Sequence, residues 1–375
     1  MFNLFIINME KVGPIGNPKD LQLESLNAEF KLPDKYEIIK KIGKGAYGKV
    51  ISALDKKNNL IVAIKKIPDI LWNLYNAKRV VSELKILDFL YHENIILLLD
   101  VIVQNKVKFD VYIVTEKMDL NLAQLIFSNH ELSAYHVKYI SYQILRGLYF
   151  MHSADIIHRD LKPNNILINE NCDTKIADFG FARDFSSNIE MTREVQARSY
   201  RAPELIFDFK KYDTSIDMWS FGCILAEMLT RKLLFASALP ADQIIKIIEV
   251  LGYPKEEIDF IQDASIKEKI SKYKDIKTIN FKEKFTGSDP EAIDLLSKLL
   301  VFDPKKRFSA EQCLKHPYYK NLHDECGEPV SEKKYEWSWD KHEATYDKAR
   351  REILLLSKKK KRQNLSKTIK ENESK

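Results

Sequence analysis

The stretch His158-Arg159-Asp160-Leu161-Lys162-Pro163-Asn164-Asn165, followed by Asp178-Phe179-Gly180, is the most informative part of this chain. It presents carboxylates at Asp160 and Asp178 and an amide at Asn165. Carboxylate and amide oxygens are ligands of divalent cations, and a carboxylate can also orient the proton of a hydroxyl group. If the fold brings these three side chains together, the combination predicts a site that binds a divalent cation and orients a hydroxyl group.

The residues around this stretch follow two different repeat patterns. From Tyr36 to about Met118, short runs of branched and aromatic residues have the composition of strands, and a helix is expected from about Ala77 to Leu90. Beyond Met118, apolar residues recur at spacings of three and four, as in an α-helix. We therefore expect an α+β protein with two lobes, a small antiparallel β-sheet lobe (36–118) and a larger, mainly helical lobe (119–319). The expected strands include Tyr36–Ile39, Ile61–Ile64 and Val111–Val114, and the expected helices include Val137–Met151 and Ile216–Leu229.

The two ends of the chain differ from its centre. Residues 1–35 show no sustained period and are expected to form an extension, in which Met9 is an alternative start. Residues 357–375 are expected to form a basic, disordered tail. This tail has 8 basic and 2 acidic residues, so it accounts for the formal net charge of +6. Its run Lys358–Arg362 also fits a nuclear import signal or a patch for anionic partners.

The composition argues against several classes of protein. No apolar run approaches the roughly 18 residues that a membrane span needs, and the N-terminus lacks the basic region and the cleavage site of a signal peptide. The cysteines are scattered and form no C-x-x-C pair, so we expect free thiols in a reducing cytosol and neither a zinc site nor disulfides. These cysteines are Cys172, Cys223, Cys313 and Cys326.

A glycine-rich stretch lies between two expected strands: Ile42-Gly43-Lys44-Gly45-Ala46-Tyr47-Gly48-Lys49-Val50. Glycines allow a tight hairpin and a close approach of the backbone to phosphate groups. The same spacing occurs in dinucleotide-binding folds, but these need a helix that opens at the third glycine. Because residues 50–54 have strand composition, the stretch predicts a phosphate-binding hairpin.

In the order of its motifs, the chain resembles a eukaryotic protein kinase over residues 36–319. The resemblance rests on the glycine-rich stretch, on Val62-Ala63-Ile64-Lys65, on the two motifs quoted first and on Ala202-Pro203-Glu204. It implies ATP and Mg²⁺ as cofactors. It also implies a role for each of these residues: Lys65, paired with Glu83, contacts the nucleotide phosphates, Asp160 orients the substrate hydroxyl, Lys162 steadies the transferred group, and Asn165 and Asp178 bind Mg²⁺.

The same resemblance assigns the nucleotide site. Thr115 precedes the expected hinge Glu116-Lys117-Met118, whose backbone would bind adenine. The expected nucleotide-binding residues are Ile42, Gly43, Lys44, Gly45, Ala46, Tyr47, Gly48, Val50, Ala63, Lys65, Thr115, Glu116 and Met118. Arg307 is the expected buried partner of Glu204, which closes the activation segment.

Four stretches resemble the mitogen-activated protein kinases in particular: Arg79–Leu87, Met191–Glu204, Asp259–Phe285 and Leu322–Pro329. The third resembles a helical insert that cyclin-dependent kinases lack. The fourth, within a C-terminal extension over residues 320–356, resembles an acidic docking segment with charges at Asp324 and Glu328. The resemblance implies a monomeric serine/threonine kinase of intracellular signalling, directed to sites before proline. Its partners would be protein substrates, an upstream activating kinase and basic docking peptides, with no nucleic acid needed. We expect it in the cytoplasm, and in the nucleus if the basic run acts as an import signal.

The chain departs from the family pattern in its activation lip, where the family's second phosphoacceptor, a tyrosine, is Glu194. We expect Glu194 to replace a phosphotyrosine by pairing with Arg198 and Arg201. Phosphorylation of Thr192, read by Arg159 and Arg183, would then complete activation. The other departures are Ser82, Ala197, Ser199 and Gly327, where the family has arginine, threonine, tryptophan and a docking aspartate.

Two other functions remain open from the sequence. Ala197 and Gly327 are compatible with a weakly active kinase or pseudokinase that acts as a scaffold. A cyclin-dependent-like kinase fits the same core motifs, although the insert and the lip sequence argue against it.

Overall fold

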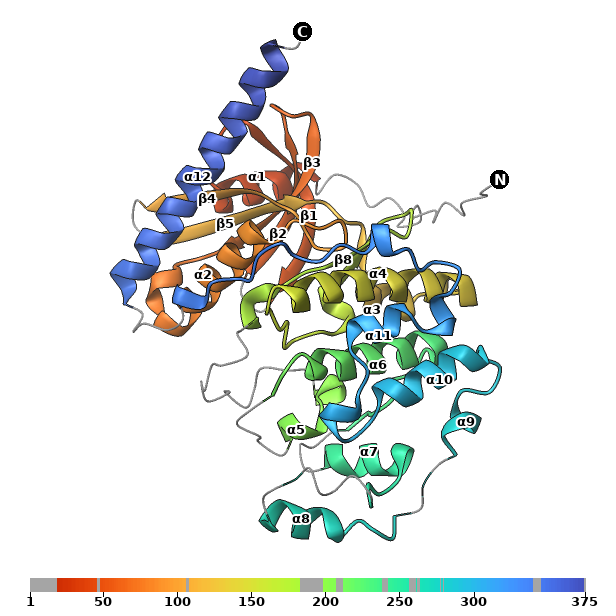
Figure 1. Ribbon diagram of the computed structural model, residues 1–375. Helices are drawn as coiled ribbons and strands as arrows, with labels where there is room; N and C mark the ends of the chain where they lie inside the picture. Colours follow the sequence, from red (N-terminus) through yellow and green to blue (C-terminus); the bar gives the residue numbers. More distant parts are fainter. Residues whose placement is uncertain are drawn as a thin grey trace. The chain divides into compact units, whose positions relative to one another are not determined.

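The structure, a computed structural model, describes residues 19–45, 48–105, 108–182, 198–206, 212–237, 242–255, 261, 264–276, 278, 280–339 and 345–373. The chain divides into two compact units (Figure 1). The first contains Met1–Asp119 and Glu336–Lys375, and the second contains Leu120–Tyr335. The predicted α+β class is confirmed, because the first unit is built on an antiparallel sheet and the second is mainly helical.

The sheet of the first unit has five antiparallel strands in the order β1-β2-β3-β5-β4. Hairpin connections place β1, β2 and β3 side by side, while β5 inserts between β3 and the edge strand β4. The three strands expected from branched and aromatic runs lie in β1, β3 and β5. The strand bounds are β1 Tyr36–Gly45, β2 Gly48–Asp55, β3 Leu60–Ile67, β4 Leu98–Asn105 and β5 Phe109–Glu116.

Helix α2 (Leu74–Phe89) is the helix expected near Ala77 to Leu90. It begins after Asn73, whose side-chain oxygen accepts hydrogen bonds from the backbone N–H groups of Tyr75 and Asn76 and so caps the first turn. Its buried residues include apolar side chains and also Glu83. A buried carboxylate needs a cationic partner, and the expected partner of Glu83 is Lys65 on β3.

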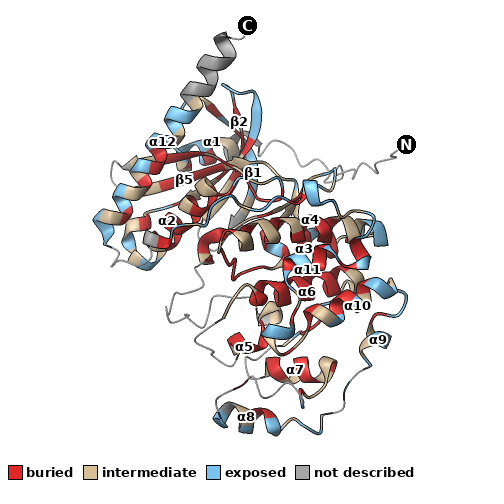
Figure 2. Cartoon of the chain, viewed as in Figure 1, coloured by how far each residue is buried: buried red, intermediate tan, exposed pale blue. Residues whose placement is uncertain are grey.

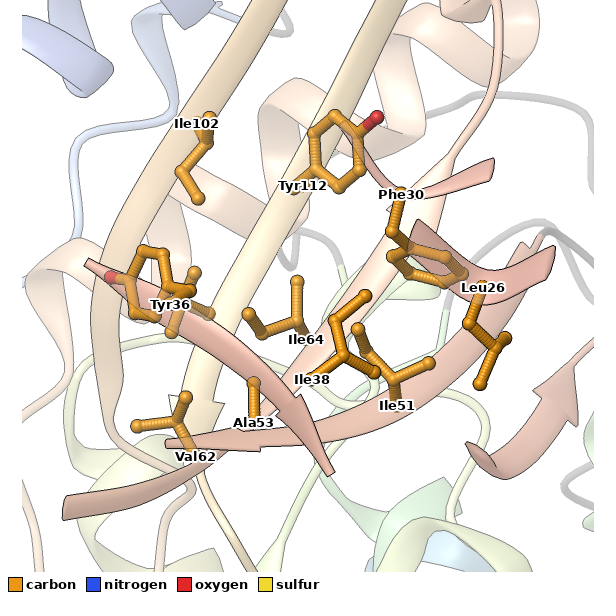
Figure 3. Packing of buried hydrophobic residues seen from close by; sticks show 11 residues of the cluster. Leu26, Phe30, Tyr36, Ile38, Ile51, Ala53, Val62, Ile64, Ile102 and Tyr112 are labelled. Carbon is orange, nitrogen blue, oxygen red and sulfur yellow. The ribbon is translucent and has the colours of Figure 1, made fainter. Parts of the chain in front are cut away.

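A helix in the N-terminal extension differs from the expectation of an irregular segment. Helix α1 (Lys19–Glu29) places Leu23 and Leu26, together with Phe30 just beyond its end, on one face. These side chains join the cluster of the sheet, next to residues such as Ile51 and Tyr112 (Figure 3). Among the side chains described in this segment these three are too few to produce a detectable repeat, and burial against the sheet stabilises the helix.

The second unit is organised around α6 (Ser215–Thr230), which is buried along nearly its whole length (Figure 2). This matches the run Ile216–Leu229, which is apolar on almost every side. The expected helix with period three and four is α4 (Ala134–Ser153). The remaining elements are β6 Leu120–Asn121, β7 Ile166–Ile168, β8 Thr174–Ile176, α3 Leu122–Ile126, α5 Pro203–Ile206, α7 Asp242–Leu251, α8 Ala264–Ser271, α9 Phe281–Lys284, α10 Pro290–Leu299 and α11 Ala310–Leu314.

The C-terminal residues return to the first unit as helix α12 (Tyr346–Glu373), which packs against α2 and β4. The basic run Lys358–Arg362 lies within this helix, where the sequence predicts a disordered tail. Ala349, Ile353 and Leu356 are buried on one side of α12 and supply the packing that the charge count does not reveal. None of the helices described here is long and apolar enough to cross a membrane.

Candidate active site

The glycine-rich stretch forms the ends of β1 and β2, with Gly43 opposite Val50 and Gly45 opposite Gly48. Ala46 and Tyr47 lie outside the described residues. A Cβ atom on Gly48 would lie 1.8 Å from the carbonyl oxygen of Lys66 on β3, a distance at which two atoms overlap. Glycine is therefore required at this position, because the hairpin lies directly against the neighbouring strand.

Lys65 on β3 and Glu83 on α2 form an ion pair. The ammonium group of Lys65 lies 3.0 Å from Oε1 and 3.3 Å from Oε2 of Glu83, so both carboxylate oxygens share it. The side chain of Glu83 is 9% exposed and that of Lys65 is 26% exposed. The pair is shielded from water on the helix side, and the cation retains access on the other.

Thr115 on β5 is paired with Ala63 on the neighbouring strand β3. Ala63 lies two residues before Lys65 on β3. Because side chains alternate along a strand, Ala63 and Lys65 lie on the same face of the sheet. Glu116, the first residue of the expected hinge, accepts a hydrogen bond of 2.8 Å from the backbone N–H of Leu97 through its side chain. This contact ties the end of β5 to the segment before β4.

Asp160, Lys162 and Asn165 form one cluster in the second unit. The Lys162 ammonium lies 2.6 Å from Oδ2 of Asp160, and the amide nitrogen of Asn165 donates to both the carbonyl oxygen (2.8 Å) and Oδ2 (3.1 Å) of Asp160. Asp160 is 2% exposed. Burial raises the pKa of Asp160, the Lys162 ammonium counteracts this rise, and the negative charge of Asp178 adds to it.

The residues of this cluster fit a magnesium ion. Both hydrogen bonds of the Asn165 amide use its nitrogen, which leaves its oxygen as the atom able to bind a cation. Asp160 and Asp178 are close enough for their charges to interact, and a divalent cation relieves such repulsion. Mg²⁺ is usually bound by one or two carboxylates together with substrate phosphates. The proposed site has two carboxylates and an amide, and in the described part of the chain no group of three or more His, Cys, Asp or Glu side chains is placed to bind a metal ion.

Two residues of the site adopt left-handed backbone conformations, Arg159 with φ 69° and Asp178 with φ 65°. Such conformations are uncommon for residues other than glycine and persist where surrounding contacts impose them. Asp217 of α6 supplies these contacts for Arg159. Its carboxylate, which is fully buried, accepts from the backbone N–H groups of His158 (2.8 Å) and Arg159 (2.9 Å) and contacts the His152 ring (3.0 Å).

Asp217 was missed by the sequence reasoning. The available signal is a lone carboxylate in the first turn of a helix whose other residues are almost all apolar. A buried acid in such a position needs donors from elsewhere in the fold. Burial by itself would raise the pKa of Asp217, but hydrogen bonds and charge from His152 and His158 outweigh this effect and lower it.

The predicted pair between Glu204 and Arg307 is confirmed. Arg307 binds Glu204 through two parallel contacts, 2.8 Å to Oε1 and 3.1 Å to Oε2, and both side chains are at most 1% exposed. Arg307 also donates to the carbonyl oxygens of Ser215 and Val301. The pair thereby fixes α5 to α6 and to the segment after α10.

The activation lip is only partly described. Arg183, Thr192, Glu194 and Ala197 lie outside the described residues, so the expected pairing of Glu194 with Arg198 and Arg201 stays a prediction. Of the arginines expected to read a phosphate on Thr192, Arg159 is described and is 8% exposed, with its guanidinium over the Tyr212 ring.

The two expected docking carboxylates have different environments. Asp324 is exposed, whereas Glu328 is 8% exposed and its Oε1 atom accepts from Tyr142 (2.7 Å) and contacts His323 (2.9 Å). Arg146 lies beside them and donates to the carbonyl oxygen of Gly327. Glu328 therefore organises the turn internally, whereas the Asp324 side chain is exposed and its Oδ1 atom accepts a hydrogen bond from the backbone N–H of Cys326 (3.1 Å).

Comparison with known proteins places the geometry in context. Residues 36–319 match the protein kinase domain. The chain is 42% identical over 334 residues to mitogen-activated protein kinase 5 of Arabidopsis thaliana, covering 88% of this chain and 89% of that protein. It is 44% identical over 315 residues to mitogen-activated protein kinase HOG1 of Candida albicans, covering 83% and 82%. It is 45% identical over 318 residues to extracellular signal-regulated kinase 1 of Dictyostelium discoideum, covering 84% of this chain and 60% of that protein.

Proposed function

Since this chain belongs to the protein kinase family, and within it to the mitogen-activated protein kinases, we propose that it phosphorylates Ser or Thr residues that are followed by proline. It is a serine/threonine protein kinase, and protein kinases use ATP and Mg²⁺. The substrate preference and the roles of individual residues are proposed below from the contacts of the described side chains.

Lys65 binds the α- and β-phosphates of the nucleotide in this proposal. Its ion pair with Glu83 supports the role, because the shared carboxylate fixes the direction of the lysine side chain. The glycine hairpin contributes backbone N–H groups, and Gly48 lets the hairpin lie close to β3. Glu116 and Met118 hold adenine through their backbone, with Thr115 at the entrance to a pocket behind it.

Asp160 orients the substrate hydroxyl and accepts its proton in the proposed reaction. Its buried position and its contacts with Lys162 and Asn165 support this role, because they fix the carboxylate, and the Lys162 ammonium opposes the rise in its pKa that burial causes. Lys162 is also placed to steady the negative charge of the transferred group. When bound, ATP supplies the γ-phosphoryl group and Mg²⁺ neutralises its charge, and Asn165 and Asp178 are the residues that hold the metal.

The single observation that supports the proposal is the cluster of Asp160, Lys162 and Asn165, since it brings the residues proposed as general base, cation and metal ligand within hydrogen-bond distance. The test compares two peptides that differ only in the residue after the acceptor serine, proline or alanine. The wild-type enzyme should prefer the proline peptide, and Asp160→Asn should phosphorylate neither. Equal rates on the two peptides would refute the substrate preference.

A scaffold with little activity is the second candidate, and one local observation bears on it. A Cβ atom on Gly327 would lie 3.1 Å from Oδ2 of Asp324, so a larger residue here requires a small shift of the exposed Asp324 side chain, and glycine adds no charge to the segment. This favours altered docking and does not affect the catalytic cluster. The mitogen-activated relatives reported above disfavour a cyclin-dependent-like kinase.

Regulation and location complete the proposal. Glu194 acts as a permanent substitute for a phosphotyrosine, and an upstream kinase phosphorylates Thr192. Basic docking peptides bind at Asp324. The kinase works as a monomer in the cytoplasm, and it enters the nucleus under conditions that expose its basic run, Lys358–Arg362.

A further inference from the structure

Helix α12 contacts the helix that carries Glu83 and one strand of the sheet that carries Lys65. It packs against α2, which carries Glu83, and against β4, the edge strand of the sheet that contains Lys65. All four elements belong to the first unit. The position of α2 relative to the sheet determines whether Glu83 reaches Lys65, so an element that binds both can set that distance.

The contacts with α2 are ionic and lie at its C-terminal half. Lys85 of α2 lies 2.8 Å from Glu352 of α12. One turn later, the Asp88 carboxylate lies 2.6 Å from the ammonium of Lys359 and 2.9 Å from that of Lys360. The Asp88 side chain is only 9% exposed. The α12 residues that bind it belong to the basic run expected to be a disordered tail.

The contacts with β4 are hydrogen bonds to its carbonyl oxygens. Ser357 donates to Val101 (2.7 Å) and Asn364 donates to Leu99 (3.3 Å). Lys360 donates to Leu98 (3.3 Å), and the same ammonium group binds Asp88. Lys360, whose side chain is 12% exposed, therefore joins α2 to the edge of the sheet through one cationic group.

We propose that Lys359 and Lys360, bound to Asp88, act as positioning residues that hold α2 against the sheet and so keep Glu83 paired with Lys65. Glu83 lies five residues before Asp88 on the same helix, and an α-helix of this length moves as a rigid element, so restraining its last turn restrains the glutamate. A partner that recognises the basic run must therefore displace Lys359 and Lys360 from Asp88.

Two other lysines of the same run provide a matched control. Lys358 and Lys361 are exposed, as Lys359 is, but the ion pairs of Asp88 are with Lys359 and Lys360, so replacing Lys358 and Lys361 removes the same charge from the same helix and leaves these pairs intact. The test variant is Lys359→Ala/Lys360→Ala, and the control is Lys358→Ala/Lys361→Ala. Asp88→Asn removes the negative charge that binds the two lysines and hardly changes the shape of the side chain. Thermal melting verifies that each protein folds.

Two measurements separate positioning from general stability. Amide hydrogen exchange should become faster in α2 for the test variant and for Asp88→Asn, while exchange in α6 stays unchanged. The kcat for a peptide substrate should fall about three- to tenfold, with a smaller change in KM, because fewer molecules hold the Lys65–Glu83 pair. Combining the test variant with Asp88→Asn should add little, since both remove the same two ion pairs. The control should match the wild type in both measurements.

The inference rests on the proposed role of the Lys65–Glu83 pair, and the two measurements distinguish their failures. If α2 exchange responds and kcat does not, α2 is held as inferred but the pair lacks its proposed catalytic role. If test and control variants give the same α2 exchange, the positioning role of Lys359, Lys360 and Asp88 is refuted, whatever the activity.

Discussion

Replacing Arg307 by alanine should destabilise the second unit strongly. The Glu204 carboxylate, 1% exposed, would lose both of its contacts with the guanidinium, and the carbonyl oxygens of Ser215 and Val301 would lose their donor. Breaking a buried pair by removing one partner costs about 3 to 5 kcal/mol, because the remaining charge stays buried. For a unit of this size, about 2 to 4 °C of melting temperature corresponds to each kcal/mol. We therefore expect the melting temperature to fall by about 6 to 20 °C.

Thermal unfolding followed by circular dichroism, with two comparison variants, tests this reasoning. Lys315→Ala breaks an ion pair with Glu311 of the same 2.8 Å length, but both side chains are 54% exposed, so the melting temperature should not change. The double variant Glu204→Leu/Arg307→Met replaces both charges by apolar groups and should be more stable than Arg307→Ala alone. A shift for Arg307→Ala as small as that for Lys315→Ala would refute the assigned importance of burial.

Three further predictions concern the site and its regulation. Gly48→Ala should reduce activity at least tenfold, because the added Cβ atom would overlap a backbone oxygen. Gly43→Ala should retain more activity, because its Cβ atom would lie 3.8 Å from Val50, an ordinary contact distance. Titrations of activity against ATP concentration compare the two variants. Glu194→Gln should lower the rate of peptide phosphorylation severalfold, and full activity would leave the substitute for phosphotyrosine without support. Asp324→Lys should weaken binding of a basic docking peptide about tenfold by fluorescence anisotropy, and an unchanged affinity would place docking elsewhere.

The two-lobed pattern was predictable because its main elements have strong local signals. The runs at Tyr36–Ile39 and Val111–Val114 became strands, and Ile216–Leu229 became the buried helix α6. Helix α1 gave no comparable signal, because the side chains described there that pack on the sheet, Leu23, Leu26 and Phe30, are too few to form a repeat. Its stability comes from long-range packing, which a local repeat does not encode.

The candidate site was predictable where a residue type and its motif jointly define the chemistry. Asp160, Lys162 and Asn165 were expected from one short stretch, and the structure places them together. Asp217, which supports the backbone before Asp160, was not predictable in the same way. It lies in another element and acts through backbone N–H groups, so no pattern of side chains links it to the motif.

Charge was a weaker guide than burial. Glu328 carries the charge expected of a docking residue, but its contacts with Tyr142 and His323 are internal. Likewise, Lys359 and Lys360 belong to a run that resembles a solvated tail, yet they bind the nearly buried Asp88. Tyr142 lies far from Glu328 in the sequence, and Asp88 lies far from the two lysines, so only the fold shows that these charges already have partners.

The rate of radiolabelled phosphoryl transfer from ATP to a generic basic protein, measured for the wild type, Lys65→Met and Asp178→Asn, tests the central claim most directly. The wild-type protein should transfer phosphate, and both variants should lose at least about a hundredfold in rate, because in the proposed site these groups bind phosphates and metal. Both variants should remain folded by circular dichroism, and Lys65→Met should melt at a lower temperature, because it leaves the nearly buried Glu83 carboxylate without its cation. A Lys65→Met protein that transfers phosphate at the wild-type rate would contradict the assignment of this site as the catalytic centre.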